Sequence, residues 1–503
     1  MIRPRQIVSA GNLTALISGA ALPLAYSPYD FYPLAIIAPS FLVYLWLRAT
    51  PSKAFVFGYL FGLGMFGVGV GWLHISINLF GGVNLAGAYI LTLVFVAFIA
   101  LFPALAGYLG ARLRHHDYPR FSALLLIPAV WTLLEWIRSW FFTGFPWLNL
   151  GYSQIDSLLQ GLAPVTGVFG ISFALMLTAG ALAILIRSNW TDRIIVSALT
   201  ILLWTVCAIF ARQEWTTPLP ESITVALVQG SVAQELKWTP EMRKPTMDRY
   251  LELTKPYLGR DLIIWPEAAI PAFYDQIPEY INTLLALTAQ SHSSLVLGLP
   301  YRDMNIEKYY NSVILLGENT SFYFKRHLVP FGEYLPLNSL LREVVDFLHI
   351  PMSDFSSGED LPPLMHAGKF TIGISICYED TFGEEVIDAL PAADILVNIS
   401  NDAWFGDSAA PHQHLQMARM RALESGRYLL RATNTGITAI VDEKGKVIDA
   451  LPQFTSTALS GVARLYTGMT PYARMGNYPV LLLVILVVAA ATGLKWRRLR
   501  INE

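Results

Sequence analysis

The stretch Phe370-Thr-Ile-Gly-Ile-Ser-Ile-Cys-Tyr-Glu-Asp380 decides the fold of the polar half of the chain. β-Branched and small residues alternate along it and then give way to Cys377 and acidic residues. This pattern predicts a buried strand that delivers a cysteine to a turn at the edge of a sheet. The chain has 2 cysteines, and Cys207 lies in an apolar run. Cys377 is therefore a candidate nucleophile, with a small buried core thiol as the alternative.

The composition divides the chain into an apolar part and a polar part. Hydrophobic residues make up 54% of the 503 residues and charged residues 14%, whereas a soluble protein carries about 25% charged residues. The 35 basic and 37 acidic residues nearly balance, which argues against a nucleic-acid partner. Apolar residues concentrate before residue 211 and after 477. We expect a membrane domain over 1–211, a soluble domain over 212–475, and a last helix with a basic cytoplasmic tail over 476–503.

A membrane crossing needs about 20 mainly apolar residues, and the apolar parts supply eight candidate transmembrane helices. We expect the N-terminal run to be retained, because the polytopic pattern continues without a small-residue processing site. The predicted spans are Ile7–Ala25, Tyr32–Leu47, Ala54–Leu79, Val83–Leu109, Phe121–Trp140, Val165–Ile186, Ile194–Ala211 and Tyr478–Leu494.

Basic residues fall in alternate loops and after the last span, where Lys495 to Arg500 form a cluster. By the positive-inside rule these loops are cytoplasmic, so both termini lie inside and the soluble domain lies outside. We expect the outer compartment to be a bacterial periplasm.

Three features of the membrane part allow further predictions. Glycines between Gly58 and Gly71 crowd one helix and favour close helix packing rather than catalysis. The aromatic loop from Arg138 to Asp156 is either an interfacial belt or a lipid-facing floor beneath an active site. Glu135 is costly in hydrocarbon and is expected to face protein, with Arg138 as a candidate partner.

In the soluble part, polar residues stand at or just after strand ends. Glu267 follows the apolar run Asp261-Leu-Ile-Ile-Trp-Pro, Cys377 follows the stretch quoted above, and Asn398 lies near the end of a third strand. Strands alternating with helices predict a layered α/β domain, and sites in such sheets gather at strand ends. These groups are expected to meet.

A carboxylate, a lysine and a cysteine suffice for acyl transfer through a thioester. The carboxylate takes the thiol proton, the thiolate attacks, and the ammonium stabilises the oxyanion. The reaction requires no metal, cofactor or histidine. We interpret His412 and His414, on an expected helix, as surface or structural residues, and find no histidine in an evident triad context. No spacing of residues argues for a metal site.

The motifs resemble a known superfamily. Trp265-Pro-Glu267, Lys325 followed by Arg-His-Leu-Val-Pro-Phe-Gly-Glu333, and Cys377-Tyr-Glu379 look like the Glu-Lys-Cys triad of carbon–nitrogen hydrolases, or nitrilases. The segment Arg421 to Gly436 is similar as well. With Asn401-Asp-Ala-Trp404-Phe-Gly and the eight spans, the whole chain resembles the bacterial apolipoprotein N-acyltransferase family.

The resemblance implies an αββα sandwich outside the cytoplasm and an enzyme of lipoprotein maturation in the inner membrane. It implies a phospholipid acyl donor, typically phosphatidylethanolamine, and as acceptor the free α-amino group of a diacylglyceryl-cysteine apolipoprotein. Cys377 would be the nucleophile, Glu267 the general base and Lys325 the oxyanion-side cation. Glu333 would orient the triad or the acceptor amine. The pocket would be shaped by Tyr378, Glu379, Trp238 and Trp404. Nothing requires more than a monomer.

One segment and two other functions complete the predictions. The amphipathic stretch Leu340–Phe355 is either a mobile arm that dips into lipid or a surface helix. A membrane-anchored amidase would use the same triad on a small amide, but one anchoring helix would suffice for it. A transporter or binding protein would leave the triad unexplained, and the spans carry few of the intramembrane charges that transport pathways need.

Overall fold

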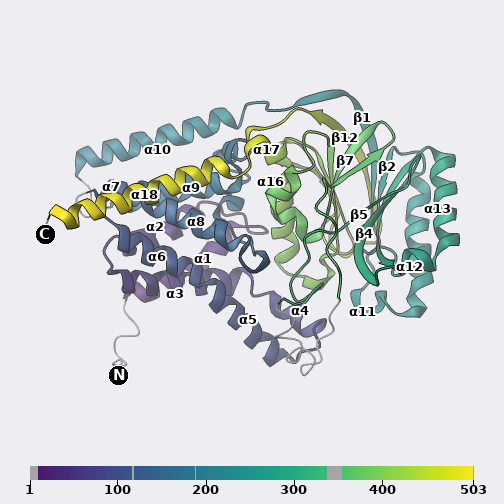
Figure 1. Ribbon diagram of the computed structural model, residues 1–503, viewed down its shortest axis with the longest axis horizontal. Coiled ribbons are helices and arrows are strands. Elements are labelled where there is room, and N and C mark those ends of the chain that lie inside the picture. Colours follow the sequence, from purple (N-terminus) through teal and green to yellow (C-terminus); the bar gives the residue numbers. More distant parts are fainter. Residues whose placement is uncertain (1–9, 116–117, 187–188, 337–353, 502–503) are drawn as a thin grey trace. The chain divides into compact units, whose positions relative to one another are not determined.

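The computed structural model describes residues 10–115, 118–186, 189–336 and 354–501, and the stretch predicted as an arm lies almost wholly outside them. The chain forms two compact units (Figure 1). The helical unit contains the residues up to His74, Leu85–Gln213 and those from Met475 onward. The α/β unit contains Ile75–Asn84 and Glu214–Arg474.

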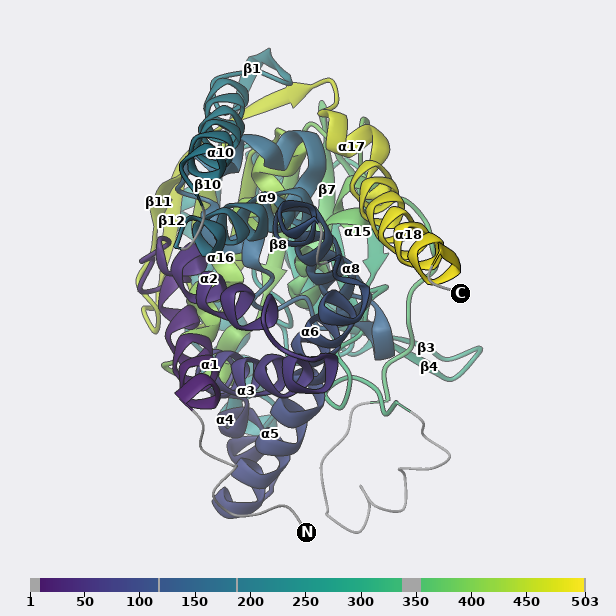
Figure 2. The same cartoon turned by 90° about the vertical axis from the view of Figure 1, so that its left-hand side faces the viewer.

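Apolar helices make up the helical unit, and Figure 2 shows several of them, such as α9 and α10, nearly along their axes. Two of these helices pack against several others: α3 (Pro51–Gly69) contacts α1 and α6, and α9 (Ala163–Leu185) contacts α2 and α8. The helices are α1 (Ala10–Ala21), α2 (Leu34–Trp46), α3 (Pro51–Gly69), α5 (Leu85–Ile99), α6 (Leu101–Leu113), α8 (Ile127–Arg138), α9 (Ala163–Leu185), α10 (Trp190–Phe210) and α18 (Tyr478–Ile501).

Six helical segments of the described residues are long and apolar enough to cross a membrane. The segments that match the first two predicted spans, Ala10–Ala25 and Leu34–Trp46, are shorter apolar helices. A multi-pass membrane unit follows from these lengths. The six are Pro51–Gly69, Leu85–Leu113, Pro119–Arg138, Leu158–Leu185, Trp190–Phe210 and Tyr478–Lys495.

The third predicted span, Ala54–Leu79, is wrong as a continuous helix. Helix α3 ends at Gly69, where the next residue, Val70, leaves the helical conformation with φ −126°. The chain then forms a separate short helix, α4 (Leu73–Leu79), and residues Ile75–Asn84 belong to the α/β unit. Hydropathy continues across this break, so an apolar run alone did not reveal it.

The glycines of α3 pack against neighbouring helices, as predicted. A Cβ added at Gly58 would lie 2.2 Å from the Pro103 carbonyl oxygen, and one at Gly64 would lie 2.4 Å from that of Leu16. Both distances are far shorter than any real contact. These positions therefore allow backbones to approach closely, which is how small residues serve helix pairs in membranes.

Glu135 and Arg138 on α8 hold the loop that follows them. Glu135 is buried, and its Oε1 accepts hydrogen bonds from Trp131 Nε1 and from the backbone N–H of Leu150, both at 2.9 Å. Arg138 donates to the carbonyl oxygens of Phe145 and Trp147 at 2.6 and 2.7 Å. Glu135 thus faces protein, as expected. Of the aromatic residues in this loop, Trp140, Phe141 and Phe142 are exposed, whereas Trp147 and Tyr152 are buried.

The α/β unit contains two six-stranded sheets, which confirms the predicted layered α/β domain. The first has the order β12-β1-β2-β3-β4-β5 and the second β11-β10-β9-β8-β7-β6. The strands of the first sheet are β1 (Thr217–Gln229), β2 (Leu262–Ile264), β3 (Ser294–Asp303), β4 (Lys308–Leu316), β5 (Ser321–Phe324) and β12 (Thr457–Thr467). Those of the second are β6 (Leu364–Ala367), β7 (Phe370–Ile376), β8 (Ile395–Ser400), β9 (Leu429–Thr433), β10 (Ala439–Val441) and β11 (Val447–Ala450).

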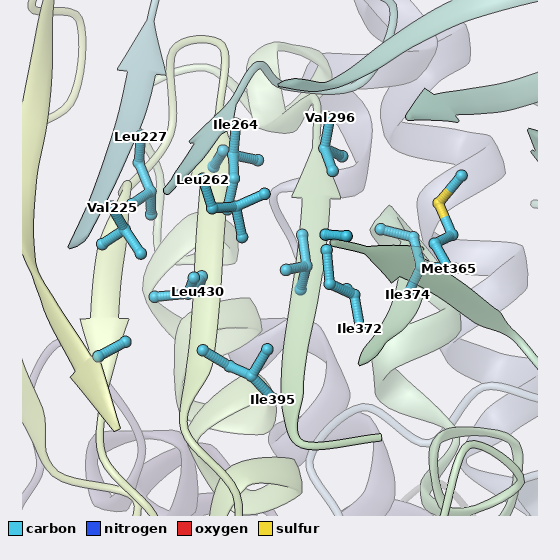
Figure 3. Packing of buried hydrophobic residues seen from close by; sticks show 14 of the residues in the cluster. Val225, Leu227, Leu262, Ile264, Val296, Met365, Ile372, Ile374, Ile395 and Leu430 are labelled. Carbon is cyan, nitrogen blue, oxygen red and sulfur yellow. The ribbon is translucent and has the colours of Figure 1, made fainter. Parts of the chain in front are cut away.

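The sheets stack face to face, and the helices cover their outer faces. Side chains of both sheets share one buried cluster, and Figure 3 shows Val225, Leu262 and Ile264 facing Ile372 and Ile395. Helices α12 (Pro240–Thr254) and α13 (Pro278–Ser291) pack on the first sheet, and α15 (Gly383–Ile387) and α16 (Ala410–Ser425) on the second (Figure 1). The unit is therefore an αββα sandwich.

The first part of the stretch quoted at the outset, Phe370–Ile376, forms β7, which pairs in parallel with β8. Ile372, Ile374 and Ile376 alternate onto the face between the sheets and are at most 2% exposed. Burying each such side chain contributes about 1.5–3 kcal/mol, so the register of β7 is strongly fixed. The residue directly after this strand is Cys377.

Candidate active site

Strand ends of both sheets supply the predicted triad. Glu267 lies in the loop after β2, and Lys325 directly follows β5 in the first sheet. Cys377 directly follows β7 in the second sheet. The loop of Glu267 passes so close to β3 that a Cβ added at Gly298 would lie 2.7 Å from the Glu267 Cα. The sequence needs glycine there for this approach.

A buried lysine joins the two predicted carboxylates. Lys325 Nζ lies 3.6 Å from Glu267 Oε1 and 2.9 Å from each Glu333 oxygen. The Lys325 side chain is 1% exposed, and those of Glu267 and Glu333 are 9% and 12% exposed. Asn311, on β4, donates to Glu267 Oε1 at 2.7 Å and to Glu333 Oε1 at 2.8 Å. Both carboxylates are therefore fixed from two sides.

Cys377 occupies a strained backbone position. Its φ is 52°, in the left-handed region that non-glycine residues rarely adopt. The side chain is half-buried, at the first residue of a 3₁₀ turn (Cys377–Thr381). Asn398 Nδ2 donates to the Ser375 hydroxyl at 3.0 Å and approaches the Cys377 carbonyl oxygen at 3.4 Å. The sharp turn presents the thiol at the strand end.

The charges around Cys377 shift the pKa of its thiol in opposite directions. Burial and the Glu267 carboxylate raise the pKa of Cys377 well above its usual range, and the Lys325 ammonium opposes them. Burial lowers the pKa of Lys325, but Glu333 and Glu267 outweigh burial and raise it above its ordinary value. The lysine is therefore a permanent cation, and the thiol is protonated until a base takes its proton.

Glu379 ties the lysine-bearing loop to the cysteine turn. Its Oε1 accepts from the Tyr323 hydroxyl at 2.9 Å and from the backbone N–H groups of Arg326 and His327 at 2.6 and 3.2 Å. Its Oε2 accepts from the Ile376 N–H at 2.7 Å. Burial raises the pKa of Glu379 to about 7. Glu379 thus connects the residues beside Lys325 to the residue before Cys377.

The three remaining predicted residues, Tyr378, Trp404 and Trp238, differ in their surroundings. The Tyr378 ring packs edge-on against His327 and Phe382. Trp404 is 40% exposed, and its ring stacks edge-on against Phe80. Trp238 is 51% exposed at the end of α11 (Gln234–Lys237).

Sequence reasoning missed two polar residues of the site. Asn311 donates to both carboxylates. The only sequence feature that could have indicated it is a polar amide residue beside an apolar run. Lys237 is fully buried, and its Nζ donates to the Glu267 carbonyl oxygen at 3.4 Å. Burial lowers the pKa of Lys237 to about 8, although Glu267 opposes this. The sequence analysis named Trp238 as a pocket residue, whereas its neighbour Lys237 is the residue that contacts Glu267.

Of the two interpretations of His414, surface or structural, the structural one is confirmed, because the side chain is buried between two carboxylates. The sequence did not reveal that His414 also lies close to Cys377. Atoms of Cys377, Asp402 and His414 lie within 4.8 Å of one another. His414 is buried on α16, with Nδ1 2.9 Å from Asp402 Oδ1 and Nε2 2.8 Å from Asp380 Oδ1. Helix α15 and strand β8 lie between Cys377 and Asp402 in the chain, and His414 follows on a further helix, so spacing could not reveal the group.

These three atoms are close enough together to be ligands of one metal ion, but their partners do not suit one. Both ring nitrogens of His414 already face carboxylate oxygens. Arg431 Nη2 lies 2.9 Å from His414 Nδ1, so a guanidinium stands where a cation would bind. The arrangement fits a hydrogen-bonded ionic cluster.

Together these groups can perform nucleophilic chemistry at a carbonyl. The site offers a thiol on a sharp turn, a buried carboxylate that can exchange a proton, and a permanent cation beside it. A second carboxylate and an amide hold the first carboxylate and the lysine in place. Such a site can form and resolve a thioester.

Comparison with known proteins agrees with this chemistry. Residues 18–181 match the family model of the apolipoprotein N-acyltransferase N-terminal domain, and residues 224–471 match that of carbon-nitrogen hydrolase. Apolipoprotein N-acyltransferase of Methylococcus capsulatus is 44% identical over 97% of this chain and 96% of its own length. That of Vibrio cholerae is 39% identical over 97% of each chain.

Among solved structures, a carbon-nitrogen hydrolase from Helicobacter pylori is 15% identical, with a TM-score of 0.36, and the match covers 48% of this chain and 88% of that chain. The relatives that match over nearly the full length decide the assignment. On their evidence, the chain belongs to the apolipoprotein N-acyltransferase family.

Proposed function

We propose that the chain is an apolipoprotein N-acyltransferase that moves a fatty acyl chain from a phospholipid to the α-amino group of a diacylglyceryl-cysteine apolipoprotein. One observation carries the proposal. The buried Glu267–Lys325–Glu333 group and Cys377 share one α/β unit, in a chain similar over 97% of its length to enzymes of that name. Phosphatidylethanolamine is the proposed donor.

The first step forms the thioester. Glu267 takes the Cys377 thiol proton as the sulfur attacks the ester carbonyl, and the oxyanion of the tetrahedral intermediate forms near the Lys325 ammonium. When the intermediate collapses, the C–O bond breaks and Glu267 returns the proton to the leaving oxygen. A lyso-phospholipid departs and the acyl chain remains on Cys377.

The second step passes the acyl chain to the amine. The neutral α-amino group attacks the thioester carbonyl, and Glu267 accepts a proton from the nitrogen as the C–N bond forms. The C–S bond then breaks, and the proton on Glu267 returns to the sulfur. The products are an amide and the free thiol, so the enzyme is ready for the next cycle.

The supporting residues keep the reacting groups in place. Lys325 carries one positive charge between two carboxylates, and Asn311 donates to both of them. Glu333 thus orients Lys325 and, through Asn311, Glu267. Tyr378, Glu379, Trp238 and Trp404 are proposed to shape the pocket, Glu379 through its bonds to the loop beside Lys325.

The proposal includes a membrane arrangement. The enzyme crosses the bacterial inner membrane eight times, six times through the long apolar helices and twice through the shorter ones at the N-terminal side. The α/β unit lies in the periplasm and both termini lie in the cytoplasm, since basic residues fall in alternate loops. The enzyme acts as a monomer.

A two-substrate assay tests the proposal. Purified protein in detergent receives phosphatidylethanolamine and a diacylglyceryl-cysteine peptide, and in a parallel reaction a short aliphatic amide. We expect an N-acylated peptide and an equal amount of lyso-lipid, both absent with Cys377→Ala. Release of ammonia from the amide, with no acylated peptide, would instead identify a membrane-anchored amidase.

A further inference from the structure

A buried ionic cluster lies behind the proposed nucleophile. Its four members, Asp380, Asp402, His414 and Arg431, come from the cysteine turn, the turn after β8, helix α16 and strand β9, and each is at most 1% exposed. Arg431 Nη1 donates to Asp380 Oδ2 at 2.8 Å, and Nη2 donates to Asp402 Oδ2 at 3.0 Å. Buried charges are stable only when they are paired, and these four groups pair with one another.

The hydrogen bonds of His414 determine its charge. Nε2 faces Asp380 Oδ1 at 2.8 Å and Nδ1 faces Asp402 Oδ1 at 2.9 Å, and a carboxylate oxygen only accepts. Arg431 Nη2, which only donates, also lies 2.9 Å from Nδ1, but the two carboxylates outweigh it, so both ring nitrogens carry hydrogens. Burial and Arg431 lower the pKa of His414, but Asp380 and Asp402 outweigh them and raise it to about 9. At neutral pH the cluster holds two negative and two positive charges and is neutral.

The cluster is close enough to act on the sulfur of Cys377. Atoms of Cys377, Asp402 and His414 lie within 4.8 Å of one another. Asp402 raises the pKa of the Cys377 thiol, after the larger effects of burial and Glu267. Without the imidazolium, the cluster would carry a net negative charge beside the atom that must become a thiolate.

The same cluster holds the backbone of the cysteine turn. Arg431 Nη1 donates to Asn398 Oδ1 at 2.6 Å, and the amide nitrogen of Asn398 donates to the Ser375 hydroxyl at 3.0 Å. Asp380 lies three residues after Cys377, in the same 3₁₀ turn. Charge and geometry at the nucleophile are therefore both tied to this group.

We propose that His414 is a positioning residue of the nucleophile: its imidazolium balances Asp402 behind the Cys377 sulfur and so lowers the cost of forming the thiolate. This inference rests on the proposed role of Cys377. The charged groups that face His414 are Asp380, Asp402 and Arg431. Those that act on Cys377 are Glu267, Lys325, Asp402 and Glu333, and Arg431 interacts with it as well.

The arrangement differs in chemistry from a Cys–His–Asp triad. An imidazolium with both N–H groups donated to carboxylates has no lone pair, so His414 does not take the thiol proton. Glu267 remains the base. His414 acts through its charge alone, which makes its effect dependent on the charge of its neighbour Asp402.

Alkylation of Cys377 by iodoacetamide tests the charge balance in the full-length protein in detergent. The rate, followed by mass spectrometry of the Cys377 peptide between pH 7 and 8.5, reports the thiolate fraction. We expect His414→Gln to lower this rate about tenfold or more, because an uncompensated charge within 5 Å shifts a pKa by a unit or more. His412→Gln, on the same helix and next to Gln453, should react like wild type.

A double variant separates charge from packing. His414→Gln with Asp402→Asn is neutral again, so its alkylation rate should recover to near that of wild type. A merely structural role predicts that the double variant reacts no faster than the single one, and that result would overturn the proposal. Unchanged alkylation in folded His414→Gln would overturn it as well.

Asp402→Asn alone gives a second test that does not depend on the folding of His414→Gln. It leaves His414 paired with Asp380 and removes a negative charge beside the sulfur, so alkylation should be faster than in wild type. An equal or slower rate contradicts the proposal. Because alkylation needs neither phospholipid nor peptide, these results stand apart from success or failure of the acyl-transfer assay.

Discussion

Lys325 Nζ lies 2.9 Å from Glu333 Oε2, and the lysine side chain is almost completely buried. A buried ammonium needs such a partner, and Glu267 at 3.6 Å supplies a second one. The site therefore has one fixed positive charge between two carboxylates. In the proposed reaction, Glu267 therefore carries the protons between Cys377 and the substrates, while the lysine keeps its charge throughout.

Replacing Lys325 by Met should damage both stability and chemistry. Removing one partner of a buried ion pair typically costs about 3–5 kcal/mol, because the other charge is left uncompensated. Loss of a group that stabilises an oxyanion costs roughly 10²–10³ in rate. Thermal unfolding and the rate of thioester formation measure the two effects. Lys325→Arg keeps the charge and should unfold closer to wild type; a Met variant as active as wild type would refute the assigned role.

Asn311 should matter to the rate although it does not react. Asn311→Leu removes the donor shared by Glu267 and Glu333, so we expect roughly a tenfold to hundredfold slower thioester formation, in line with general acid–base contributions of about 10²–10⁴. Asn311→Asp should be slower still, since it adds a third carboxylate. Asn305→Ala, in the exposed turn between β3 and β4, is the matched control. Equal rates for the Leu and control variants would exclude a positioning role.

Glu379 should make stability depend on pH. Its pKa is raised to about 7 in the folded protein, against an ordinary value of 4.5. Between these values the folded state binds more protons than the unfolded state, so the free energy of unfolding falls as pH rises. The Glu379→Gln variant does not titrate there. The stability of wild type relative to this variant should therefore decrease from pH 4.5 to pH 7, as followed by denaturant unfolding in detergent. A constant difference would contradict the raised pKa.

Gly298→Ala should displace Glu267, the proposed general base. The added Cβ would lie 2.7 Å from the Glu267 Cα and from the Ala268 nitrogen, and backbone atoms cannot step aside easily. We expect thioester formation to fall by at least tenfold, since small misplacements of catalytic groups have effects of about 10². Gly317→Ala, whose nearest atom is the Ser294 hydroxyl at 3.2 Å, is the control. If both variants keep wild-type rates, the close approach of Gly298 to Glu267 does not affect the reaction.

Local patterns predicted the strand and the turn that carry Cys377, the proposed nucleophile. Alternation of Ile372, Ile374 and Ile376 marks one face of β7, and this face is indeed buried between the sheets. Glu267 was predicted from its place after an apolar strand and from the resemblance to nitrilases, and Lys325 from that resemblance. In the structure, the side chains of Glu267 and Lys325 form an ion pair. Such predictions succeed because each depends on a few neighbouring residues.

Contacts between distant segments could not be predicted in this way. His414 was interpreted as surface or structural, because its partners Asp380, Asp402 and Arg431 lie on other elements. Asn311 faces the carboxylates only because β4 lies beside β3 in the first sheet. The break after Gly69 left no mark in hydropathy, since the residues on both sides are apolar. Each of these features depends on tertiary packing.

The central claim is a lipid-derived thioester on Cys377, and intact mass measures it most directly. The purified protein is incubated in detergent with phosphatidylethanolamine and no acceptor, beside Cys377→Ala. The account predicts a hydroxylamine-labile gain of one fatty acyl chain that maps to Cys377, is absent from the variant, and is discharged by a diacylglyceryl-cysteine peptide. A folded protein with a free Cys377 thiol and no acyl adduct would contradict it.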